Sequence, residues 1–207
     1  MSAAQHEQQA RQETSAADRD AAKYDPGALA VAQGCGPYDG VCWRSKRNPT
    51  ARFRDMAEQH RRAAAEHRAA SAVLRDIEAT ACTGIAAEDR DISPFERTDD
   101  VASAAPLTEE RATGVGRSRT VTVGARVVFY PVPGLTPEKL QREVDCHLAR
   151  AAVLGHELPE MPDCPLVPKG AQARVVVTEH GLTVEIRGED STAAADIIAR
   201  AERLKIR

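Results

Sequence analysis

The feature that most constrains this fold is a stretch of 33 residues, Thr50 to Cys82, that contains neither glycine nor proline. Asn48 and Pro49 precede it. Asparagine is a favoured N-cap, and proline suits the first helical turn because its missing N–H would be unpaired there anyway. Gly84 follows as a stop signal. At 1.5 Å per residue, the stretch predicts a helix roughly 45–50 Å long.

A seven-residue repeat runs along this helix and predicts a packed stripe. Its main positions are Phe53, His60, His67, Leu74 and Ala81. The intervening positions of the stripe are assigned to Met56, Ala63, Ala64, Ala70, Ser71, Ile77 and Glu78. A stripe with this period is a coiled-coil-like seam of a/d type. The helix must therefore pack along another helix, formed either by the N-terminal arm or by a second copy of the chain.

The regions around this helix are interpreted from composition. Residues 1–24 carry alanine, glutamine and charge with almost no large apolar side chain, which predicts a mobile arm or a weakly docked helix. Residues 25–96 hold a cysteine loop and the long helix. Residues 97–117 lose all periodicity and are rich in Asp, Thr, Ser and Gly, which is typical of a linker.

From residue 118 the pattern changes to alternating strands and helices. A strand is predicted near residues 121–130, a helix from Thr136 to Leu154, and a hairpin over residues 173–187. Ser191 is the predicted cap of a last helix. The predicted class is therefore α+β: the long N-terminal helix plus a C-terminal β-α-β-β-α sandwich of ferredoxin-like type over residues 118–207.

The five cysteines form no C-x-x-C pair, which excludes zinc ribbons, thioredoxin-type pairs and c-type haem attachment. Cys35 and Cys42 flank a Gly-Pro-Tyr-Asp-Gly turn, so a disulfide between them is expected. Such a bond favours an extracytoplasmic location, periplasmic or secreted. The odd cysteine count leaves one thiol over, and the pairing of Cys82 stays open.

The densest group of chemically versatile side chains lies between residues 146 and 164. Thiolate, thioether and imidazole together select copper or zinc, and nearby prolines stiffen the loop that would carry these ligands. The alternatives are a Cys146–Cys164 disulfide, worth about 3 kcal/mol for a loop of this size, or buried unreactive thiols. The candidate metal ligands are Cys146, His147, His156, Met161 and Cys164.

The long helix offers a second candidate metal site. Met56 and His60 are one turn apart and could bind one ion, whereas His67 lies about 10 Å further along the helix. The competing interpretation is that these side chains only fill the seam.

Charge and motifs narrow the function. The 28 basic and 31 acidic residues give a formal charge of −3, which makes no case for nucleic acid. No apolar run approaches the ~18 residues of a membrane span, although basic residues near Arg44 leave peripheral membrane contact open. No catalytic motif or phosphate-binding loop occurs, so neither an enzyme nor a bound nucleotide is expected.

The sequence therefore predicts a non-catalytic extracytoplasmic module that binds a soft transition metal, copper first and zinc second. The alternative is a structural or interaction subunit of a larger assembly, whether or not that assembly is associated with a membrane. In that alternative the cysteines form disulfides, and the long helix binds a helical partner or a second copy of the chain.

Overall fold

The structure, a computed structural model, describes the chain apart from residues 36–41, 115, 160, 180 and 205–207. It divides into two compact units, which are described separately. One unit comprises residues 4–72, and the other comprises residues 1–3 and 73–207.

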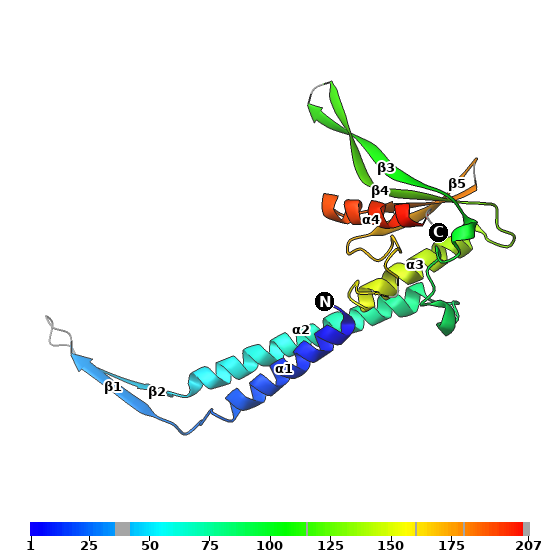
Figure 1. Cartoon of the computed structure of the whole chain (residues 1–207). Helices are drawn as coiled ribbons and strands as arrows, with labels where there is room; N and C mark the ends of the chain where they lie inside the picture. Colours follow the sequence, from blue (N-terminus) through cyan, green and yellow to red (C-terminus); the bar gives the residue numbers. More distant parts are fainter. Residues whose placement is uncertain (36–41, 115, 160, 180, 205–207) are drawn as a thin grey trace. The chain divides into compact units, whose positions relative to one another are not determined.

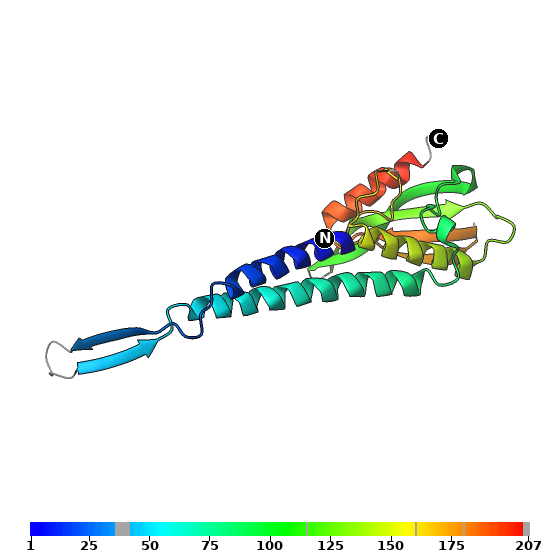
Figure 2. The same cartoon turned by 90° about the horizontal axis from the view of Figure 1, so that it is seen from below.

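The unit of residues 4–72 is built from two helices and a β-hairpin (Figures 1 and 2). Its helices are α1 (Ala3–Ala21) and α2 (Ala51–Ala81), and α2 continues into the other unit. The predicted long helix is thus confirmed, and its start is capped as expected. The Asn48 Oδ1 atom accepts a hydrogen bond of 2.8 Å from the Thr50 amide.

Alanines fill the seam between α1 and α2. Ala10, Ala17, Ala57 and Ala64 are each 1% exposed, and each pair is spaced by seven residues. The N-terminal segment, expected to be a mobile arm or a weakly docked helix, is a helix that packs along α2 through these alanines. The seam follows position 57 rather than position 56, and Met56 is 41% exposed.

Polar side chains line the rim of this seam and show that the helices run antiparallel. His60 Nδ1 lies 2.6 Å from Glu13 Oε2. His6 Nδ1 lies 3.0 Å from His67 Nδ1. The early part of α1 thus meets the later part of α2.

The predicted cysteine loop is a β-hairpin of β1 (Ala30–Cys35) and β2 (Cys42–Arg47). Its register places the backbone of Cys35 opposite that of Cys42. The side chain of Cys35 lies outside the described residues, so the Cys35–Cys42 disulfide stays a prediction.

The other unit contains an antiparallel sheet with two helices on one face (Figures 1 and 2). The sheet order is β3-β4-β6-β5. The elements in chain order are β3 (Val101–Gly114), β4 (Arg117–Phe129), α3 (Pro137–Val153), β5 (Gln172–Thr178), β6 (Gly181–Arg187) and α4 (Ser191–Arg203). A mixed α and β structure with antiparallel sheets is confirmed. The predicted β-α-β-β-α order is not, because the structure has one more strand, β3, before the first predicted strand.

The additional strand, β3, occupies most of the predicted linker of residues 97–117. Only Ala104 and Leu107 are buried along it. The strand is held by backbone pairing with β4 instead of by an apolar face, so its sequence carries no alternation to indicate it.

Side-chain caps begin both helices of this unit. Thr136 caps α3 as predicted, with its Oγ1 accepting from the Lys139 amide at 3.2 Å. The cap of α4 is Asp190 rather than the predicted Ser191. No described helix is long and apolar enough to cross a membrane.

The core of this unit lies between the sheet and its helices. Its side chains include Phe95, Val127, Phe129, Leu140, Val144, Val184, Ile186 and Ile197.

Enlarging one seam alanine is expected to destabilise the helix pair. Ala64→Leu should lower the free energy of unfolding by about 1–3 kcal/mol, because the tightly packed seam has no room for added methyl groups. Ala65→Leu, at the neighbouring exposed position, should be nearly neutral. Urea unfolding followed by circular dichroism measures both, and equal effects would contradict the alanine seam.

The histidine pair predicts acid sensitivity of the same helices. Burial, and then repulsion by His67, lower the pKa of His6 below its usual 6.5. The unfolded chain therefore binds the proton more readily, so stability is full above pH 6.5 and declines as the pH falls below it. His6→Gln should flatten this part of the curve. The check is the melting temperature of both proteins between pH 5 and pH 8, and parallel curves would refute the role of His6.

Candidate functional site

A disulfide between Cys82 and Cys146 anchors the region that holds most of the candidate site residues. Cys82 directly follows α2, Cys146 lies within α3, and both are buried. The expected Cys146–Cys164 bond is therefore wrong. The short sequence separation favoured it, but the fold brings a cysteine 64 residues away from Cys146 into bonding distance instead.

Cys164 is a free thiol in a buried polar cluster. It is 3% exposed and His147 is 2% exposed. The His147 Nε2 atom lies 3.3 Å from Cys164 Sγ. The Ser93 hydroxyl donates to the same sulfur at 3.3 Å. Three segments of the chain thus meet at one sulfur atom: α3, the loop after it, and the turn before β3.

Burial keeps both the thiol and the imidazole neutral. Burial raises the pKa of the Cys164 thiol, although the hydrogen bond from Ser93 acts in the opposite direction. Burial also lowers the pKa of His147 to about 4, and Asp91 only partly offsets this. A cysteine nucleophile needs a thiolate, usually beside an imidazolium. This pair is therefore not an activated nucleophile at neutral pH.

The His147 Nδ1 atom is buried and has no hydrogen-bond partner among the described residues. An unpaired acceptor is tolerated in a protein interior more readily than an unpaired N–H donor. We therefore assign the proton to Nε2, which then donates to Cys164 Sγ. The His147 imidazole therefore makes its hydrogen bond to Cys164 Sγ, and its Nδ1 atom makes none to another described residue.

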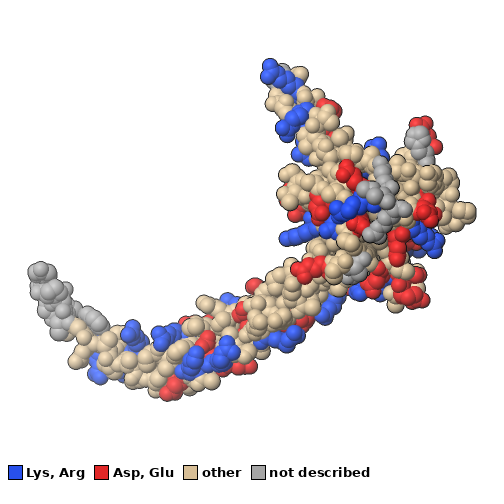
Figure 3. Space-filling view, viewed as in Figure 1, with Lys and Arg blue, Asp and Glu red and all other residues tan. Residues whose placement is uncertain are grey.

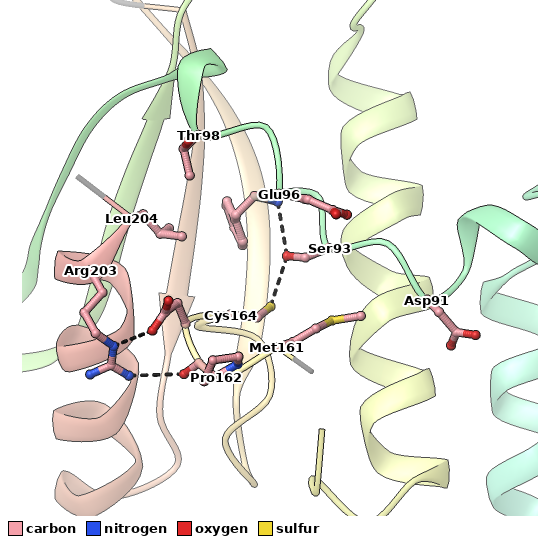
Figure 4. A pocket seen from close by; sticks show the side chains of 11 residues that line it. Asp91, Ser93, Glu96, Thr98, Met161, Pro162, Cys164, Arg203 and Leu204 are labelled. Carbon is pink, nitrogen blue, oxygen red and sulfur yellow. Dashed lines mark hydrogen bonds and ion pairs between the residues drawn. The ribbon is translucent and has the colours of Figure 1, made fainter. Parts of the chain in front are cut away.

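A cavity of about 280 Å³ lies beside Cys164 (Figure 4). Met161, Cys164 and Arg203 are among its lining residues. Arg203 holds the loop against α4, because its guanidinium donates to Asp163 Oδ1 at 2.6 Å and to the Pro162 carbonyl at 3.1 Å. The loop that forms this wall of the cavity is therefore held to α4 by an ion pair, in addition to being stiffened by its prolines.

The predicted ligands of the C-terminal group are only partly brought together. The sulfur of Cys146 is bonded to Cys82 and therefore offers no thiolate to a metal. His156 follows the end of α3 with a φ of 63°, and its Nδ1 lies 2.9 Å from the Val167 carbonyl oxygen, so it holds the loop's backbone. Cys164 and His147 are adjacent, and Met161 shares the cavity with Cys164. Among the described residues, no group of three or more His, Cys, Asp or Glu side chains could hold a metal ion.

The predicted ligands on α2 are separated by their partners on α1. His60 contacts Glu13, and its Nε2 atom lies 3.7 Å from Asp20 Oδ2. His67 contacts His6, and Met56 faces away from the seam. Sequence reasoning missed the α1 partners, although His6, Glu13 and Asp20 are themselves spaced by seven residues. Ser93 had no local signal, since it reaches Cys164 only through tertiary folding.

Loss of the disulfide should be costly. A Cys82→Ala/Cys146→Ala double variant is expected to lose about 4 kcal/mol of unfolding free energy, because the bond closes a loop of 64 residues in the unfolded chain. Cys164→Ala is the control, and should lose less because it breaks no covalent link. Urea unfolding without reductant compares the two, and equal losses would contradict this assignment.

The buried thiol should be protected from reagents. At pH 8, alkylation of Cys164 by iodoacetamide should be at least 100-fold slower in the native protein than in urea, because the reagent needs an exposed thiolate. Peptide mass spectrometry over time gives both rates. Rapid native labelling would show that the loop over Cys164 opens readily.

Comparisons with protein families, with curated proteins and with solved structures found no match to this chain. A fold by itself does not specify a function. The chemistry and exposure of the chain's own residues are therefore the basis on which a function can be proposed.

Proposed function

We propose that this chain is a non-catalytic, extracytoplasmic interaction protein that docks on a partner through the outer part of the β3–β4 hairpin. We call this part the outer ribbon and define it as residues 108–114 and 117–122. The proposal moves the partner-binding element away from the long helix, because the α2 seam is already filled by α1.

The observation that carries the proposal is the isolation of the outer ribbon from the rest of the sheet. Its two strands pair with each other from Thr108↔Thr122 to Gly114↔Arg117. β6 pairs with β4 only over residues 124–128. Every described residue from Glu110 to Thr120 is exposed, and the hairpin projects from the sheet (Figure 1).

Such a ribbon has little reason to exist as a purely structural element. Two strands without a buried face are marginally stable in water, and open strand edges invite pairing with other chains. Proteins that recognise peptides by strand addition use this kind of edge. The outer ribbon is therefore best explained as a docking element.

The disulfide supports the proposed compartment. Bonds of this kind persist in oxidising environments and are rare in the cytosol. The Cys82–Cys146 bond is compatible with an extracytoplasmic location, which we propose as the place where the partner is met.

Site-specific crosslinking tests this function. A photoreactive amino acid at Ser118, in the outer ribbon, should crosslink to another polypeptide in the source cells. The same amino acid at exposed Glu202, on α4, is the control and should give no crosslink. Absence of a Ser118 crosslink, with the protein present and oxidised at Cys82 and Cys146, would contradict the proposal.

Metal binding is a second candidate, favoured by the 3.3 Å separation of Cys164 Sγ and His147 Nε2. Copper(I) suits this donor set, because it is soft and Met161 lies on the same cavity. Zinc fits less well, since a structural zinc site needs four ligands. The thiol would have to release its proton to the solvent on binding.

Metal titration separates this candidate from the first. The purified protein should take up about one equivalent of Cu(I), and Cys164→Ser should abolish that uptake. Met56→Leu, on the exposed side of α2, is the control and should leave uptake unchanged. Equal uptake by the Cys164→Ser variant would exclude this cluster as the copper site.

A further inference from the structure

Three arginines share one face of the outer ribbon. Arg111 on β3 stands directly opposite Arg119 on β4. Directly opposed residues of an antiparallel pair point to the same face, and so do residues two apart on one strand. Arg117 therefore joins them, and basic side chains gather at the free end of this hairpin (Figure 3). We call Arg111, Arg117 and Arg119 the arginine face.

The charges of the arginine face are only partly balanced within the described chain. No described carboxylate lies within ion-pair distance of any of the three guanidinium groups. Glu109 lies on the same face and attracts Arg111 at longer range, but its carboxylate is already paired with Arg187. Glu110 accepts a hydrogen bond from Thr120, and both belong to the opposite face. Like charges placed opposite each other destabilise a strand pair, so an external carboxylate would relieve this repulsion.

The β4 edge of the ribbon is the second observation. Over residues 117–122, β4 pairs only with β3, because its pairing with β6 begins at Gly124. The backbone groups of this edge can therefore accept another strand. Side chains on one face of a strand recur about every 6.6–6.8 Å, which is the spacing of Arg117 and Arg119 and of alternate residues in an added strand.

We propose that the β4 edge of the outer ribbon binds an extended acidic segment of a partner protein as an added strand, with carboxylates at alternate positions facing the arginine face. This inference rests on the proposed interaction function and names the chemistry of its partner. Backbone pairing fixes the register, and the arginines select acidic side chains by charge-assisted hydrogen bonds.

The opposite face of the ribbon argues against nucleic acid. It carries Glu110 together with Ala112, Ser118 and Thr120, so a polyanion enclosing both faces would meet a carboxylate. Typical DNA-binding proteins also neutralise about 6–10 phosphates, well above three. A membrane is disfavoured because the described ribbon has no large aromatic or long aliphatic side chain to insert. A peptide paired to the β4 edge lies beside Arg117 and Arg119, whereas Glu109, on the same face, belongs to β3 on the other side of β4.

Peptide binding to the full-length protein tests the inference by fluorescence anisotropy. The probe is a labelled eight-residue peptide that alternates glutamate and threonine. It should bind, whereas the same peptide with glutamine for glutamate should bind at least about ten-fold more weakly. A third probe keeps the charge but carries N-methyl groups on alternate residues, which block one strand edge. This peptide should also bind at least about ten-fold more weakly than the unmodified acidic peptide.

Matched variants locate the binding surface. Arg117→Gln/Arg119→Gln should weaken binding of the acidic peptide by about 10- to 100-fold. Arg61→Gln/Arg62→Gln removes the same charge from the exposed surface of α2 and should leave binding unchanged. Unaltered circular dichroism spectra and melting temperatures establish that both variants are folded.

Several outcomes would overturn the inference. Equal binding of the N-methylated peptide would reduce the interaction to charge attraction without strand addition. Tighter binding of a DNA duplex or of anionic phospholipid vesicles through Arg117 and Arg119 would assign the face to another partner. Failure of the acidic peptide to bind, with the Ser118 crosslink retained, would overturn this inference alone. Loss of that crosslink would overturn the proposed function itself.

Discussion

The Cys82–Cys146 bond is the interaction on which the larger unit most depends. It joins the end of α2 to α3 and encloses the whole chain between them, which includes β3 and β4. Arg150, about one turn beyond Cys146, pairs with Glu78 at 2.9 Å and with Asp91 at 2.7 Å. The same junction is therefore fixed twice, once covalently and once by ion pairs. The projecting hairpin has a separate anchor, because β4 pairs with β6 over residues 124–128.

Local signals predicted helices and short strands well and predicted long-range partners poorly. Asn48 and Thr136 indicated two helix starts correctly because a cap is a contact within a few residues. β3 could not be found, since beyond Leu107 it has no buried side to impose alternation. Cys82 could not be assigned because sequence distance says nothing about which thiols a fold brings together.

The candidate site shows the same limit at the level of chemistry. His147 and Cys164 were both recognised as chemically important residues, and the structure places them in contact. What the sequence could not supply was their burial, which keeps both groups neutral, or the hydroxyl of Ser93. The net charge of the chain was equally uninformative about its local surfaces. A net charge of −3 described the whole chain correctly and concealed a local face of three arginines.

The alanine seam has a consequence for how the helices of residues 4–72 lose their structure. Alanine buries little apolar area, so separating α1 from α2 exposes little new surface to solvent. The dependence of unfolding free energy on denaturant concentration scales with that newly exposed surface. We therefore expect the free energy of unfolding of the helix pair to fall only gradually with denaturant concentration, and that of the unit whose core contains Phe95, Phe129 and Ile197 to fall more steeply. The two units should thus differ in cooperativity, because one is packed with alanine methyl groups and the other with large side chains.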